Sequence, residues 1–131
     1  MKVQKLMGLL VTGLLFNMVI LADANAESIR LRCEVRKNPA RAKISVDGRG
    51  FAVGQYRAKV TSGGKTKITK LPAQSPVGGE VEFDFDSNRA DVREGATFIQ
   101  PTFIKDKRIT ATIIDQDGFA VAPQAKACRA R

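Results

Sequence analysis

Four side chains that could supply oxygen ligands lie close together in the middle of the chain. Asp84, Asp86 and Asn88 have a D-x-D-x-N spacing, Asp91 follows three residues later, and Glu94 is a further candidate. A hard cation such as calcium binds about six to eight oxygens, and this spacing brings three side chains within one turn. The candidate calcium ligands are therefore Asp84, Asp86, Asn88 and Asp91.

The match to an EF-hand calcium loop is partial. Arg89 occupies the position where the loop needs glycine, and Gly95 the position where it needs an acid. Arg93 adds further positive charge. The simpler interpretation, which we favour, is a solvated acidic strand face that runs into a capped turn, with nearby cations balancing its carboxylates.

Cationic side chains are concentrated in the first half of the chain. Residues 27–70 hold 12 Lys and Arg against three acids, whereas residues 71–131 hold eight against nine. A continuous cationic patch could bind a polyanion, an anionic surface or an acidic protein. The candidate residues for such binding are Arg30, Arg32, Arg36, Lys43, Arg57, Lys59, Lys65 and Lys67.

Other interpretations of this charge stay open. Charged residues on strands keep sheet edges from aggregating, so the set could serve solubility alone. The cations could also meet the carboxylates of another copy, which would give self-association. Nucleic acid is a weaker candidate, because single-strand readers stack bases on aromatic rings and this half has only Phe51 and Tyr56.

Residues suited to catalysis are scarce. The chain has no His and two Cys, which we expect to be paired, so nucleophilic triads and metal-dependent hydrolysis lack their parts. Asp84 and Asp86 could in principle serve glycoside cleavage, but neighbouring acids on one strand are more simply a charged face. We expect no enzymatic activity.

The N-terminal segment has the composition of an export signal. Lys2 and Lys5 precede an apolar run over residues 6–21, and Ala24-Asn25-Ala26 offers small residues for cleavage. We expect residues 1–26 to be a cleaved signal peptide and residues 27–131 a single domain without a transmembrane segment. Cleavage would leave 20 basic and 12 acidic residues in a periplasmic or extracellular protein.

Cys33 and Cys128 are the only cysteines, near the two ends of the remaining chain. Export would place them in an oxidising compartment, where they would form a disulfide. A small exported domain often depends on such a covalent link for its stability.

The elements that carry these residues are predicted to be strands. Alternating apolar and polar residues favour strands over 29–36, 42–46, 55–61, 65–70, 81–86, 96–99, 102–104, 108–115 and 119–128, with a short helical turn after Asn88. In the acidic strand, Val81, Phe83 and Phe85 would face the core. The intervening acids Glu82, Asp84 and Asp86 would form an outward carboxylate row.

The hairpin around Ser62-Gly63-Gly64 is predicted to present a tight cationic face. Lys65 and Lys67 share one side of its second strand, and the register could place them beside Arg57 and Lys59. This face would belong to the same cationic patch.

The stretch from Arg108 to Phe119 resembles the last hairpin of bacterial immunoglobulin-like modules. The resemblance implies an immunoglobulin-like sandwich and no particular activity. Together with the strand pattern, it predicts an all-β fold: an antiparallel β-sandwich of seven to eight strands, with one disulfide between the first and last strands.

The expected function follows from export, the lack of catalytic residues and the charge asymmetry. We expect a non-enzymatic exported binding module whose basic N-terminal half engages an anionic surface or protein partner. The alternative is a calcium-stabilised structural component of an envelope or extracellular assembly.

Overall fold

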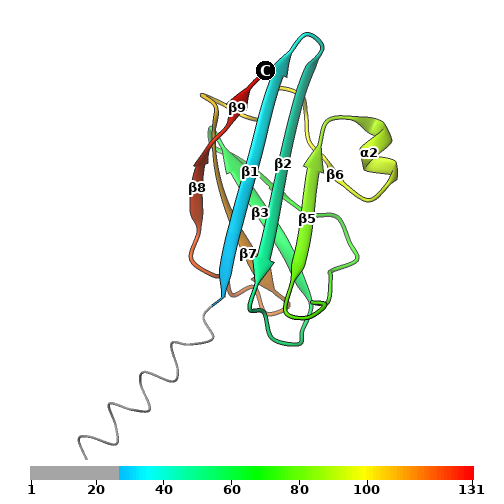
Figure 1. Cartoon of the computed structure of the whole chain (residues 1–131), viewed down its shortest axis with the longest axis vertical. Helices are drawn as coiled ribbons and strands as arrows, with labels where there is room; N and C mark the ends of the chain where they lie inside the picture. Colours follow the sequence, from blue (N-terminus) through cyan, green and yellow to red (C-terminus); the bar gives the residue numbers. More distant parts are fainter. Residues whose placement is uncertain (1–26) are drawn as a thin grey trace, which may run out of the picture.

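Strands form most of the regular structure in residues 27–131, the part of the chain that the computed structural model describes (Figure 1). The predicted signal peptide, residues 1–26, lies outside the described residues. The elements are β1 (Ser28–Lys37), β2 (Ala40–Arg49), β3 (Tyr56–Ser62), β4 (Lys65–Ile68), β5 (Val81–Asp86), α2 (Arg89–Arg93), β6 (Thr97–Phe98), β7 (Arg108–Asp115), β8 (Gln124–Ala127) and β9 (Arg129–Ala130). No helix in residues 27–131 is long and apolar enough to cross a membrane.

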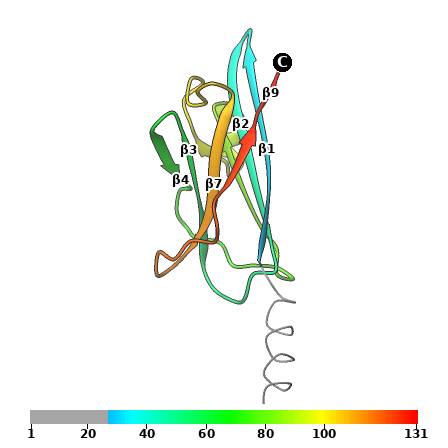
Figure 2. The same ribbon diagram turned by 90° about the vertical axis from the view of Figure 1, so that its left-hand side faces the viewer.

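The strands build two sheets that face each other (Figure 2). One sheet has the order β6-β5-β2-β1-β9 and the other the order β4-β3-β7-β8. Pairing is antiparallel except between β1 and β9 and between β5 and β6. The predicted two-layer, all-β architecture is confirmed. The described range holds nine strands rather than seven or eight, and two of them, β6 and β9, are two-residue strands at the edges of the five-stranded sheet.

The core lies between the sheets because apolar side chains occupy every second position of the central strands. Val81, Phe83 and Phe85 of β5 are buried there, as their alternation predicted. Gly48 of β2 permits a close approach: a Cβ atom at this position would lie 2.7 Å from Ile113 Cδ1 of the other sheet. A larger residue would have to displace the side chains of Phe51, Ile113 and Val81.

Two predicted strands differ most from the structure. Residues 102–104 lie in a loop, and Phe103 and Ile104 are apolar because this loop covers the core. The strand predicted over 119–128 is limited to Gln124–Ala127, since Pro123 has no N–H to offer a neighbouring strand. Asn88, by contrast, caps α2 as predicted, accepting a hydrogen bond from the Ala90 N–H at 2.8 Å.

The C-terminal segment passes from one sheet to the other. β8 pairs with β7, and β9 then pairs with β1 through Glu34–Arg129 and Val35–Ala130. Cys128 lies at the crossing and is bonded to Cys33, with 4.7 Å between the two Cα atoms. The predicted disulfide is confirmed, and it joins the first strand to the last.

Candidate functional site

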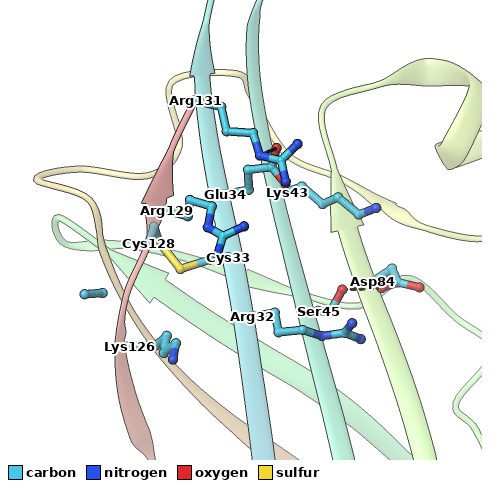
Figure 3. Close-up of a pocket in the computed structure, with 11 residues that line it drawn as sticks. Arg32, Cys33, Glu34, Lys43, Ser45, Asp84, Lys126, Cys128, Arg129 and Arg131 are labelled. Atoms are coloured by element: carbon cyan, nitrogen blue, oxygen red, sulfur yellow. Dashed lines mark hydrogen bonds and ion pairs between the residues drawn. A yellow bond between two sulfur atoms is a disulfide. The ribbon is translucent and has the colours of Figure 1, made fainter.

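A groove of about 850 Å³ opens on the outer side of the five-stranded sheet, next to the disulfide (Figure 3). Residues of β1, β2 and β5 form its floor, and the β8–β9 segment borders one side. Cations outnumber acids around it. The charged lining residues are Arg32, Lys43, Lys126, Arg129 and Arg131, against Glu34 and Asp84.

The register of three neighbouring strands explains the floor. Arg32 of β1 pairs with Ser45 of β2, which pairs with Asp84 of β5, and Glu34 pairs with Lys43. Side chains of paired residues project to the same face of a sheet, so all five residues share the outer face. The Ser45 hydroxyl donates a hydrogen bond to Asp84 Oδ1 at 2.8 Å, which holds this carboxylate in place on the floor of the groove.

The groove cations differ in whether they already have a partner. Arg32 Nη2 lies 3.1 Å from Asp47 Oδ2, and Arg131 Nε lies 3.3 Å from Glu34 Oε1. The other three make no ion pair with any residue of the described range. These unpaired cations are Lys43, Lys126 and Arg129.

Glu34 stays ionised among these cations. The hydrogen bond that Arg36 Nε donates to it at 2.8 Å lowers its pKa more than burial raises it, and the charges of Arg131, Arg36 and Lys43 lower it further. Its negative charge repels an incoming anion. Anionic groups are therefore favoured at the unpaired cations.

The structure divides the eight predicted basic residues between two faces. Four of them, Arg30, Arg32, Arg36 and Lys43, belong to β1 and β2 in the five-stranded sheet. The rest belong to β3 and β4 in the opposite sheet, so the eight do not form one continuous patch. These others are Arg57, Lys59, Lys65 and Lys67.

The predicted tight cationic face of the β3–β4 hairpin is not formed. Lys59 pairs with Ile68, and its neighbour Val60 pairs with Lys67. Because successive residues project to opposite faces, Lys67 lies on the other side of the hairpin from Lys59, and Lys65 does too. The two-residue turn between the strands sets this register.

Sequence reasoning missed three of the five groove cations. Lys126, Arg129 and Arg131 belong to the C-terminal half, whose net charge is close to zero, so the charge balance of this half does not indicate a cationic patch. The predicted disulfide is the sequence feature that indicates where these three cations lie. A bond between Cys33 and Cys128 necessarily brings the neighbours of Cys128 beside β1.

Asp86 is not part of an exposed carboxylate row, which corrects the prediction. Its side chain is buried and accepts hydrogen bonds from Arg41 Nε at 3.1 Å and Arg41 Nη2 at 2.9 Å. The same Arg41 Nη2 lies 2.6 Å from Asp91 Oδ2. A guanidinium group thus occupies the position between two of the candidate calcium ligands.

The other two candidate calcium ligands also have partners. Asp84 accepts the hydrogen bond from Ser45, and the side-chain oxygen of Asn88 caps α2. Across residues 27–131, no three acidic, His or Cys side chains are grouped so that they could hold a metal ion.

No protein-family model and no curated protein matches the chain. The arrangement of charges around the groove is therefore the feature from which a function can be inferred.

Proposed function

We propose that this protein is a non-enzymatic, exported binding module that engages an anionic surface, polymer or protein partner through the groove beside the disulfide. One observation carries the proposal: cations from both ends of the chain gather around one groove, where they outnumber the acids five to two. Three of these cations are free of ion pairs within the described residues.

The physical basis is electrostatic. Cations that line a concave surface reinforce one another's field and raise the local concentration of anions. Two features reduce the cost of ordering the site on binding: Lys43 lies on a central strand, and the disulfide ties the segment that carries Arg129 to β1.

The proposal includes export by residues 1–26 and an immunoglobulin-like arrangement of the two sheets. The Cys33–Cys128 bond supports the first part, because disulfides persist in oxidising compartments such as a periplasm or the cell exterior. The resemblance of residues 108–119 supports the second.

The test compares two triple variants that remove equal charge from opposite faces. The groove variant removes the unpaired groove cations by the substitutions Lys43→Gln, Lys126→Gln and Arg129→Gln. The matched control variant carries Lys59→Gln, Lys65→Gln and Lys67→Gln. Binding of heparin and of poly-glutamate is measured by titration calorimetry at several salt concentrations. We expect the groove variant to bind at least about tenfold more weakly than wild type, the control to change little, and wild-type affinity to fall steeply with salt.

Two results would overturn the proposal. Equal losses in both variants would show that only net charge matters. Binding that does not depend on salt would exclude the electrostatic mechanism.

A further inference from the structure

Strand β1 has a free edge that borders the groove. On one side it pairs with β2 along its whole length, from Ser28 to Lys37. On the other side it pairs with β9 at Glu34 and Val35 alone within the described chain. β8 belongs to the opposite sheet; its end next to Cys128 stays close to β1, and the strand diverges from β1 toward Gln124 (Figure 2). Residues 28–32 therefore have no strand partner on this side in the part of the chain that is described.

The backbone of this edge makes no hydrogen bond on its free side within the described chain. Outside the β1–β2 ladder, no backbone hydrogen bond between described residues involves positions 28–32. A sheet edge with unpaired N–H and C=O groups accepts an extended peptide as an additional strand. Main-chain hydrogen bonds then supply affinity, and alternate side chains supply specificity.

The side chains of β1 define which peptide fits. Arg30 and Arg32 are exposed on the outer face, whereas Ile29 and Leu31 face the core and remain 8 % and 7 % exposed. Directly opposed side chains on neighbouring strands interact, and opposite charges stabilise the pair. A matching strand therefore has acidic residues at every second position and apolar residues between them.

The opposite edge of the β1–β2 pair already carries a strand of this kind. β5 alternates apolar and acidic residues, and it pairs with β2 so that its apolar side chains enter the core. Asp84 lies on the outer face, with a hydrogen bond from Ser45. This pattern is thus compatible with the curvature and faces of the sheet.

We infer that the free edge of β1 captures an extended acidic segment of a protein partner as an added strand, with its carboxylates beside Arg30 and Arg32. Lys126 of β8, which diverges from β1, and Arg129 of β9, which pairs with β1, add attraction at the same edge. The inference rests on the proposed function, because it names the partner of the same cationic region. It adds main-chain hydrogen bonds to the binding affinity, which a purely electrostatic site does not need.

The experiment uses synthetic peptides, so the fold of the protein is not disturbed. The probe is an eight-residue peptide of alternating Val and Glu. The first control has the same sequence with N-methyl groups on every second residue, which keeps the charge and removes the ladder donors on one edge. The second control has the same composition with the four Glu grouped together. Affinity is measured by calorimetry, and amide hydrogen exchange by NMR.

We expect the alternating peptide to bind at least about tenfold more tightly than either control. We also expect it to slow amide exchange within residues 28–32 at least about tenfold. The double variant Arg30→Gln and Arg32→Gln should weaken binding of the alternating peptide, and the matched variant Lys59→Gln and Lys67→Gln should not.

The failures of the two proposals can be told apart. If all three peptides bind equally and residues 28–32 gain no protection, strand addition is wrong and the electrostatic function stands. If heparin and poly-glutamate bind but the alternating peptide does not, strand addition is again wrong. If none of the polyanions or peptides binds, the proposed function fails as well.

Discussion

A single residue, Arg41, binds two of the carboxylates in and after the acidic strand β5. It lies near the tip of the β1–β2 hairpin, and its guanidinium group hydrogen-bonds both oxygens of Asp86 while contacting Asp91 of α2. The Asn88 N–H also donates to Asp86 Oδ1 at 2.9 Å. A buried carboxylate is tolerated only with such partners, because its desolvation is otherwise costly.

The pKa of Asp86 reflects this balance. Burial raises the pKa, but the hydrogen bonds from Arg41 and from the Asn88 N–H, together with the charge of Arg41, hold it below the ordinary value of 3.8. Because the folded-state pKa is the lower one, the ionised carboxylate stabilises the fold above about pH 4. This contribution is lost as the pH falls through the folded-state pKa.

Substituting Arg41 should therefore destabilise the protein in a pH-dependent way. Arg41→Ala leaves a buried charge without its partner, and we expect a loss of about 3 kcal/mol in the free energy of unfolding at pH 7. Below about pH 4 the gap to wild type should narrow, because a protonated Asp86 does not need the cation. Urea denaturation at pH 7 and pH 3 measures both effects.

An exposed arginine provides the control for this substitution. Arg49 lies 3.4 Å from Glu80, both side chains are more than half exposed, and Arg49→Ala should cost less than about 1 kcal/mol. Similar losses in the two variants, or a loss from Arg41→Ala that does not change with pH, would contradict the buried-pair explanation.

Among the elements, the β8–β9 segment connects the two sheets and completes the groove. β8 continues the four-stranded sheet, β9 continues the five-stranded sheet, and the disulfide lies between them. The parallel pairing of β9 with β1 covers two residue pairs, and the disulfide adds a covalent link that keeps β9 beside β1.

Removing the disulfide should lower stability substantially. Cys33 and Cys128 are separated by 95 residues, and the loop-closure entropy for this length corresponds to about 4 to 5 kcal/mol. We expect the double variant Cys33→Ala and Cys128→Ala to lose about this much in urea denaturation. Urea denaturation of the wild-type protein with a reducing agent is the control, because reduction breaks the disulfide but keeps both sulfur atoms. A loss below about 1 kcal/mol in both would show that strand pairing alone positions the segment.

At the scale of the whole fold, both sheets of the described chain carry cations. The outer face of the five-stranded sheet carries the groove cations, and it also carries acids of β5 such as Asp84. The basic residues of β3 and β4 lie in the other layer. Near α2, Asp86 and Asp91 are both bound by Arg41, whose guanidinium group lies between these two candidate calcium ligands.

Calcium should therefore leave the stability of the whole protein unchanged. A ligand that binds only the folded state raises the melting temperature with its concentration. We expect the same melting temperature, within about 1 °C, in millimolar calcium and in chelator, measured by circular dichroism. An increase of several degrees with calcium, absent with magnesium, would favour the alternative function of a calcium-stabilised structural component.

Local patterns predicted much of the fold. Alternation in β1, β3, β5 and β7 predicted strands and buried faces, and Asn88 predicted the helix cap. Phe103 and Ile104 were mistaken for a strand, since apolar residues in a buried loop give the same local signal as a short strand. Local sequence patterns thus predict which element a segment forms, but not which other elements lie beside it.

The sequence by itself determined which side of each strand is apolar, where the turns fall and which two cysteines pair, because these depend on side-chain period, turn chemistry and the cysteine count. Tertiary structure alone decided which charges meet. Sheet order places Lys43 near Arg129 and far from Lys65, and register turns Lys67 away from Lys59. Sheet order and register come from pairing between distant segments, and no local period encodes that pairing.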